Sequence, residues 1–151
     1  LGRLAVESFN NSDDYHFEIG KGITLRDGKD ITIIATGLMV SRALEAVKEL
    51  EKEGIDARLI NIHTIKPIDR DIIVKAAKET GKIITVEEHN VIGGLGDAVC
   101  SVLCEECPVP VVKIGINDEF GHSGPAAALL DDYGLCAPHI VEVTKKALGK
   151  K

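Results

Sequence analysis

The hydrophobic positions of this chain change their spacing several times, and each change marks the boundary of a predicted element. Continuous or nearly continuous apolar runs fill residues 31–37, 57–63, 82–86 and 111–116, which is typical of strands buried on both faces. Between the runs, apolar residues recur every three or four positions, as they do on one face of a helix. Strands that alternate with helices predict a largely parallel sheet covered on both sides.

The predicted helices carry recognisable ends. The first runs from Val40 to Leu50 and stops at Gly54. The second follows Asp69, its expected N-cap, and is closed by Gly81. Three more helices are predicted, over residues 95–103, 125–133 and 137–148.

The first part of the chain is more polar. Residues 23–25 and 31–37 indicate two strands joined by a tight turn at Asp27-Gly28. The preceding stretch ESFNNSDDYHFEIG, residues 7–20, is acidic and typical of a linker. The chain opens on the apolar LGRLAV, which suits the end of a strand, and it has no initiator Met. We therefore expect a segment of a longer protein.

Composition narrows the classes of function. A chain of 151 residues suits one domain. Its formal charge of −6 comes from 24 acidic and 18 basic residues spread along the chain, which argues against binding to nucleic acid or to an anionic membrane. Three Phe, two Tyr and no Trp also argue against a base-stacking surface. No apolar run approaches the roughly 20 residues of a membrane helix and no secretion signal is visible, so we expect a cytoplasmic protein.

The segment EEHNVIGGLGDAV, residues 87–99, lies between a predicted strand and a predicted helix, where backbone N–H groups can receive a phosphate. Gly94 and Gly96 match the first two glycines of a Gly-x-Gly-x-x-Gly motif, but Val99 stands in place of the third. Asp97 in the first helical turn would compete with an anion for the positive helix end. Nucleotide binding is therefore the less favoured interpretation of this loop.

The polar residues of the same loop have two interpretations. Glu87 and Glu88 would point to opposite faces if the strand continues, so they cannot form a catalytic pair. His89 could act as an acid or base at neutral pH. The favoured alternative is that Glu88, His89 and Asn90 hydrogen-bond the loop or a partner surface. The glycines, Gly93 included, would then let the backbone approach another domain or subunit.

The cysteines and the other histidines do not assemble a motif. Cys104 and Cys107 form a C-x-x-C at the end of a predicted helix, without the strand context of a redox motif or a second pair for zinc. His63 and His122 are far apart in sequence, and Ser123 lacks the Gly-x-Ser-x-Gly context of a nucleophile. The cysteines and histidines therefore predict no metal site.

Three blocks of the sequence resemble the C-terminal part of transketolase, particularly the split type in which two polypeptides share the enzyme. The blocks are GKDITIIATGLMVSRALEAVKELEKEGIDARLINIHTIKPID, VEEHNVIGGLGDAV and DEFGHSGPAAALLDDYGL. Together the resemblance covers nearly the whole chain. It implies a three-layer α/β/α domain with a five-stranded mixed, mostly parallel sheet in which one strand runs against the others.

The resemblance also implies how the chain divides into segments and which domains of the full enzyme bind the cofactor. Residues 1–6 would be the remnant of a pyrimidine-binding domain, residues 7–20 a linker, and residues 21–151 the C-terminal domain. Thiamine diphosphate and Mg²⁺ would bind in the preceding domains of the full enzyme and not in this segment, which would carry no catalytic residue. The partners would be the N-terminal section or subunit, the pyrimidine-binding domain and a second copy in a homo-oligomer, with sugar phosphates as substrates of the pentose phosphate pathway.

One residue of the segment gains a role from the resemblance. Arg3 is a guanidinium in an apolar stretch, and a lone arginine is ordinarily a surface residue. In transketolases an arginine in the corresponding strand contacts the substrate phosphate, so the resemblance implies this role for Arg3 in the full enzyme.

Two alternatives remain open on the sequence. One is the C-terminal domain of a related thiamine-dependent enzyme, either deoxyxylulose phosphate synthase or the 2-oxoacid dehydrogenase beta subunit, because the fold alone does not select the substrate. The other is a stand-alone regulatory module that binds a nucleotide or anion at the glycine loop.

Overall fold

The computed structural model describes residues 16–121 and 123–149. Ten elements follow one another along the chain, and they are β1 Ile23–Arg26, β2 Ile31–Ala35, α1 Met39–Lys52, β3 Ala57–Asn61, α2 Arg70–Thr80, β4 Ile83–Asn90, α3 Leu95–Glu106, β5 Val111–Ile116, α4 Ala126–Asp132 and α5 Ala137–Ala147. The alternation predicted from the hydrophobic spacing is confirmed.

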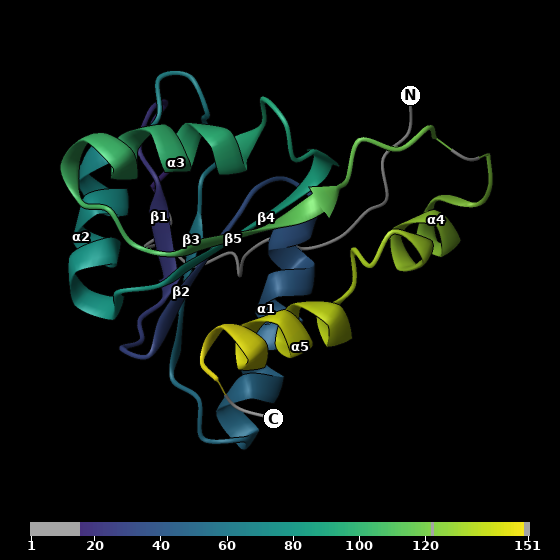
Figure 1. Ribbon diagram of the computed structural model, residues 1–151, viewed down its shortest axis with the longest axis horizontal. Helices are drawn as coiled ribbons and strands as arrows, with labels where there is room; N and C mark the ends of the chain where they lie inside the picture. Colours follow the sequence, from purple (N-terminus) through teal and green to yellow (C-terminus); the bar gives the residue numbers. More distant parts are fainter. Residues whose placement is uncertain (1–15, 122, 150–151) are drawn as a thin grey trace.

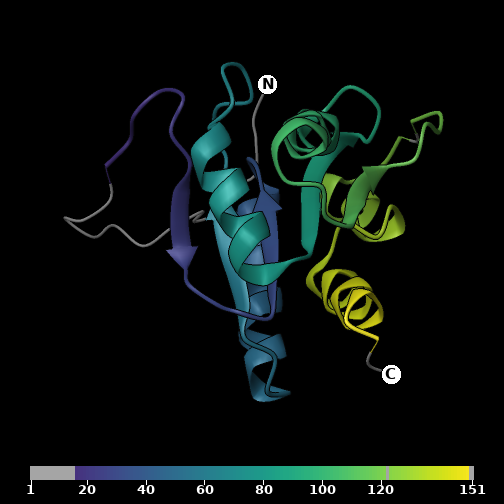
Figure 2. The ribbon, with the colours of Figure 1, turned by 60° about the vertical axis from the view of Figure 1, so that its left-hand side comes forward.

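The five strands form one sheet in the order β1-β3-β2-β4-β5. Strands β3, β2, β4 and β5 are parallel, while β1 runs antiparallel to β3, as Figure 2 shows from the opposed arrowheads. The mixed, mostly parallel sheet is thus confirmed. The tight turn at Asp27-Gly28 does not make a hairpin, because β3 inserts between β1 and β2. The residue pattern identified both strands but could not identify their neighbours.

Helices cover both faces of the sheet and form three layers (Figure 1). On one face, Ile31, Ile33 and Leu59 pack in a cluster with the buried sides of α1 and α5. On the other face, Ile34 and Ile60 pack with α2 and α3. Adjacent strand residues therefore serve opposite layers, which explains why β2 and β3 are buried at every position.

The ends of α2 follow the sequence prediction. The carboxylate of Asp69 accepts a hydrogen bond from the Ile72 amide at 3.3 Å, and Gly81 closes the helix in a left-handed conformation with φ 69°. The second oxygen of Asp69 accepts from the Gly22 amide at 2.9 Å. This N-cap therefore also holds the chain at the point where β1 begins.

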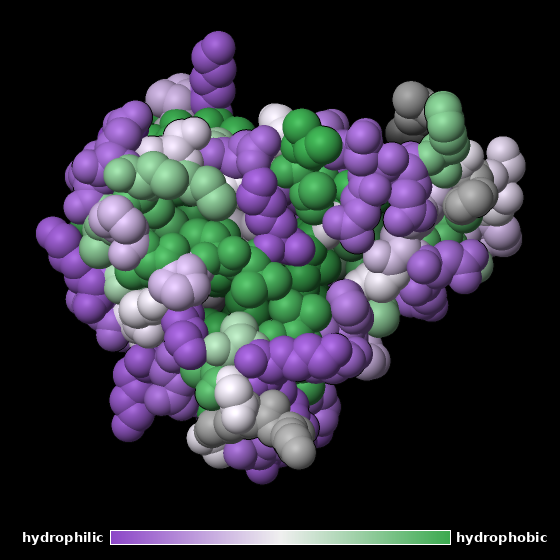
Figure 3. Space-filling view, in the orientation of Figure 1, coloured by the Kyte–Doolittle hydropathy of each residue, from purple (hydrophilic) through white to green (hydrophobic). Residues whose placement is uncertain are grey.

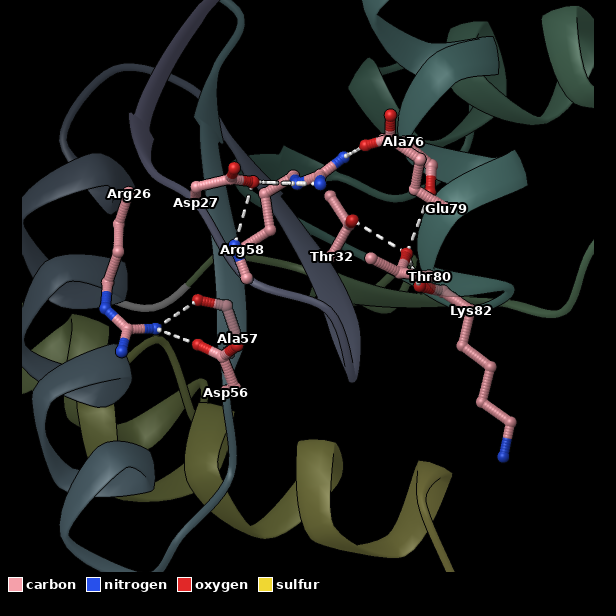
Figure 4. A network of polar contacts seen from close by, with 11 residues as sticks. Arg26, Asp27, Thr32, Asp56, Ala57, Arg58, Ala76, Glu79, Thr80 and Lys82 are labelled. Atoms are coloured by element: carbon pink, nitrogen blue, oxygen red, sulfur yellow. Dashed lines mark hydrogen bonds and ion pairs between the residues drawn. The ribbon is translucent and has the colours of Figure 1, made fainter.

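The amino ends of the central strands carry a polar network (Figure 4). The Arg58 side chain, only 10% exposed, pairs with Asp27 at 2.8 Å and with Glu79 at 2.5 Å. Arg26 donates to the Ala57 carbonyl at 2.6 Å, on the neighbouring strand. Both arginines at this end of the sheet therefore have partners within the chain.

Candidate functional site

The carboxyl ends of β2 and β4 enclose an open hollow of about 340 Å³. The connection after β2 leads through α1 to β3 on one side, whereas the connection after β4 leads through α3 to β5 on the other. Such a reversal leaves a crevice between the two strands, which is where open α/β sheets ordinarily bind ligands. The hollow is lined by Thr36, Gly37, Ile65, Glu87, Glu88, His89, Gly93 and Gly94.

Strand β4 continues through the polar residues of the loop motif instead of ending before them. It reaches Asn90, and its register with β5 shifts between Val86 and Asn90. Glu87 is 1% exposed, whereas Glu88 is half-buried at the surface. The two carboxylates therefore have different surroundings, although both residues border the hollow.

Glu87 caps the helix that follows the loop. One of its carboxylate oxygens accepts a hydrogen bond from the Leu95 amide at 2.9 Å, and the other accepts from the Gly96 amide at 2.7 Å. These amides belong to the first turn of α3, whose N-cap Gly94 supplies no side-chain acceptor. A buried carboxylate from the adjacent strand thus takes the place of a local N-cap and complements the positive helix end.

Gly94 is required by this arrangement. A Cβ at this position would lie 1.7 Å from Glu87 Oε1 and 3.0 Å from the Asn90 carbonyl oxygen. Gly96 is similarly enclosed, because its Cβ would lie 2.9 Å from Thr85 Oγ1 and 2.8 Å from the Lys113 side chain. Both glycines make room for residues of this same chain. Their presence is therefore explained without another subunit approaching them.

Asp97 and Lys113 fix the loop from the other side. The Asp97 carboxylate accepts hydrogen bonds from the Lys113 ammonium and, at 2.6 Å, from the Gly93 amide. The lysine, and next the Gly93 amide, hold the pKa of Asp97 below its ordinary value. Gly93 has φ 78°, a left-handed conformation that suits glycine.

Asn90 connects the loop after β4 to the loop after β5. Its amide nitrogen donates to Asp118 at 3.1 Å, and its oxygen accepts from the Ile92 amide at 2.8 Å. His89 is exposed, and its Nδ1 lies 3.1 Å from the Asn90 carbonyl oxygen. These contacts order the loop.

The arrangement has a clear chemical consequence for the glycine loop. The amides that would receive a phosphate, those of Leu95 and Gly96, already donate to Glu87. A bound anion would also face the carboxylates of Glu87 and Asp97 at the same helix end. The geometry therefore argues against nucleotide binding at this loop, more strongly than the missing third glycine did.

The loop residues singled out from the sequence lie around the same turn, but the sequence assigned no role in the loop to Glu87, which is central to the arrangement. Glu88, His89, Gly93 and Gly94 line one hollow, whereas Asn90 contacts Asp118 and the Ile92 amide, and Gly96 donates its amide to Glu87. Glu87 was considered only as half of a carboxylate pair. The available signal was its place directly after a buried apolar run, where an inward-pointing acid needs hydrogen-bond donors.

The remaining candidates lie elsewhere. Arg3 and His122 fall outside the described residues, as does the segment 1–6. The His63 ring stacks on Phe17 with 4.4 Å between centroids, and its Nδ1 contacts Thr64 Oγ1 at 2.9 Å. Cys104 and Cys107 are free thiols at the end of α3. Within residues 16–121 and 123–149, no group of three His, Cys, Asp or Glu side chains is arranged to hold a metal ion.

No helix in the described part of the chain is both long and apolar enough to cross a bilayer.

The fold and the loop together define a class of α/β domain. In this class the helix that begins at the switch point of the sheet has its amino end occupied by a carboxylate of the same chain, here Glu87. The family model for the transketolase C-terminal domain matches residues 20–140. The chain therefore belongs to the transketolase C-terminal domain family, as its resemblance in sequence implied.

The individual relatives are longer proteins, and this chain matches only a part of each. A 6-deoxy-6-sulfo-D-fructose transketolase subunit from Clostridium sp. (strain MSTE9) is 42% identical over 151 residues, which are 46% of its length. A 1-deoxy-D-xylulose-5-phosphate synthase from Heliobacterium modesticaldum is 45% identical over 129 residues, which are 20% of its length.

A solved structure is also similar. A split-gene transketolase, described as an inactive β4 tetramer, superposes with a TM-score of 0.88 at 53% identity, covering 97% of this chain and 47% of that one. The chain thus spans about half the length of the transketolase subunits that it matches.

Proposed function

We propose that this chain is the C-terminal domain of a thiamine diphosphate-dependent transketolase, an enzyme that transfers a two-carbon ketol unit from a ketose phosphate to an aldose phosphate. The similarity to a split-gene transketolase over 97% of the chain carries the proposal. In this role the domain supports assembly with the N-terminal section or subunit and with the pyrimidine-binding domain. The chemistry of the transfer would reside in those parts.

We propose that the cofactor binds in the other domains of the full enzyme. Thiamine diphosphate needs donors for its diphosphate and oxygen ligands for Mg²⁺. The glycine loop has committed its amides to Glu87, and the described ranges contain no cluster of metal ligands. The residues of this domain therefore do not fit the cofactor, and we derive no catalytic step from them.

Substrate identity is part of the proposal and not of the family assignment. Pentose phosphates are the proposed substrates. The Clostridium relative is named for a sulfonated ketose instead, so the assay should contain both kinds of sugar. Arg3 is the proposed contact to the substrate phosphate in the full enzyme, since a guanidinium pairs with two phosphate oxygens at once.

The first experiment measures two-carbon transfer from xylulose 5-phosphate or 6-deoxy-6-sulfofructose to ribose 5-phosphate, with thiamine diphosphate and Mg²⁺ present. It compares this chain alone, the upstream sections alone and the complete assembly. We expect transfer only in the complete assembly. Absence of transfer with all sugars in an assembly that sedimentation shows to be intact would reject the assignment.

Two further measurements separate the alternatives. Titration calorimetry of the chain with thiamine diphosphate, ATP and inorganic phosphate should give no binding heat, whereas a stand-alone regulatory module requires a ligand. Arg3→Ala in the full enzyme should raise the KM for phosphorylated sugars much more than for unphosphorylated analogues. An equal effect on both would remove Arg3 from the substrate site.

A further inference from the structure

Large apolar side chains are exposed mainly at one end of this domain. Among the described residues, six large hydrophobic side chains are exposed, and five of them belong to segments at the carboxyl edge of the parallel strands. We call these five the apolar rim, which consists of Phe17, Ile19, Ile65, Ile92 and Phe120. Exposed apolar groups gathered at one end are typical of a surface that another protein covers.

Topology explains how segments from distant parts of the sequence meet at this edge. Ile65, Ile92 and Phe120 follow β3, β4 and β5, respectively. Phe17 and Ile19 precede β1, and because β1 is antiparallel it starts where the other strands end. The start of β1 and the ends of the parallel strands lie together in the upper part of Figure 2.

Contacts beneath the rim hold its residues in place. The hydrogen bond between Asn90 and Asp118 joins the loops that carry Ile92 and Phe120. Tyr133 donates its hydroxyl to the Phe120 carbonyl at 3.3 Å. A surface ordered before contact loses less conformational entropy when it is covered, so these contacts favour a docking role.

The opposite end of the sheet has a different character. There the charged side chains pair with one another, as Arg58 does with Asp27 and Glu79 (Figure 4). One other apolar strip is visible in Figure 3, over the region of β5 between α3 and α5. Val112 of β5 is 38% exposed, which equals the exposure of Ile65 in the rim. This strand edge is the competing surface, and Val112 offers a matched control.

We propose that the apolar rim and the hollow beside it are the docking face for the domain that precedes residue 16 in the complete subunit. The inference rests on the proposed function and specifies its interface. The described residues begin at this edge, where β1 starts, so this is the edge nearest to whatever domain precedes them in the complete subunit. In the similar split-gene transketolase, more than half of the chain lies outside the matched region, because this chain covers 47% of it. A tether of this kind gives the neighbouring domain a high effective concentration at the rim.

Charge specifies the partner surface further. In the described segments of this edge, exposed or half-buried acids exceed lysines, and these groups are Glu18, Glu88, Asp118 and Glu119 against Lys21 and Lys66. The matching face of the preceding domain should therefore be apolar at its centre and basic around it.

Hydrogen–deuterium exchange on the complete subunit tests this interface. The wild type is compared with the double variant Ile65→Lys/Ile92→Lys, with the control Val112→Lys and with the chain 16–151, which contributes both of its apolar clusters from its own residues. Amides of residues 62–68 and 90–94 should exchange about tenfold more slowly in the complete subunit than in the isolated chain. The double variant should lose this protection while the amides of β2 and β3 remain protected, and Val112→Lys should retain it.

Two results would overturn the inference. Equal exchange of the rim amides in the complete subunit and the isolated chain would show that nothing covers them. The second result is that Val112→Lys loses protection at residues 111–116 while the double variant of the rim keeps its protection. This result would place the interface on the β5 edge. Transfer activity is measured on the same samples. An active enzyme with an uncovered rim would defeat this inference alone, whereas an intact, rim-protected but inactive assembly would defeat the proposed function alone.

Discussion

The contact between Gly94 and the buried Glu87 leads to a specific prediction for Gly94→Ala. The backbone at Gly94 has φ −97° and ψ −153°, which an alanine can adopt, so the backbone itself is not strained by the change. The obstacle is the new methyl group, which would lie 1.7 Å from Glu87 Oε1. Glu87 must therefore move away from the amides of Leu95 and Gly96.

The size of the effect follows from the bonds that are lost. A hydrogen bond to a charged group contributes about 1.5–3 kcal/mol, and two such bonds hold Glu87. Glu87 borders the open hollow, so the displaced carboxylate can regain some water. Replacing glycine by alanine also stabilises by about 0.4–1 kcal/mol through the unfolded state. We expect Gly94→Ala to lower the free energy of unfolding by about 2–4 kcal/mol, which combines these effects.

Urea unfolding at pH 7, followed by circular dichroism, measures this loss. Gly121→Ala is the matched control, because its Cβ would meet nothing within 4 Å and Gly121 has no left-handed backbone. It should change the free energy of unfolding by less than about 0.5 kcal/mol. The double variant Glu87→Ala/Gly94→Ala should be little worse than Glu87→Ala alone, because the methyl group then has no carboxylate to displace.

The outcome can refute the reasoning in two ways. A loss below about 0.5 kcal/mol for Gly94→Ala would mean that the carboxylate is not held as described. Additive losses in the double variant would mean that Gly94 acts through another contact.

Three further predictions concern the charged groups. The lowered pKa of Asp97 stabilises the folded protein at any pH above the ordinary pKa of an aspartate, and this contribution is lost as the pH falls through the pKa of Asp97 in the folded protein. Asp97→Asn should therefore reduce the fall in melting temperature between about pH 5 and pH 2. The same fall in the variant and the wild type would contradict this. Arg58→Met should change the free energy of unfolding by less than about 1 kcal/mol. The double variant Asp27→Asn/Glu79→Gln should lower the free energy of unfolding more, because it leaves the nearly buried guanidinium of Arg58 without a charged partner. Lys82→Ala removes the hydrogen bond at 2.7 Å to a carbonyl in the last turn of α5 and should cost about 0.5–1 kcal/mol in urea unfolding.

Local patterns were sufficient for the elements but not for their arrangement. The ends of α2 at Asp69 and Gly81 and the span of β5 were predicted correctly, because caps and apolar runs are properties of neighbouring residues. The place of β1 beside β3 depends on contacts between Ile23–Arg26 and Leu59–Asn61, more than thirty residues later. A short turn after Arg26 is compatible with either neighbour, so the sequence did not distinguish them.

The loop illustrates the same limit at the level of single side chains. Asp97 is in the first helical turn and could be recognised from its sequence position alone. Glu87 reaches α3 only because β4 continues beyond Val86 and passes beneath the helix end. Its partners lie eight and nine residues ahead, a separation that no helix-capping pattern covers.

The internal cap also bears on the proposed docking face. When a second domain covers the edge of a sheet, it excludes water from any helix that begins there. A buried backbone amide without a partner costs about 1–3 kcal/mol. Glu87 satisfies the amides of Leu95 and Gly96 within the chain, so these two amides need no acceptor from the covering domain. The same carboxylate that makes this switch point unsuitable for a phosphate therefore makes it suitable for contact with an apolar protein surface.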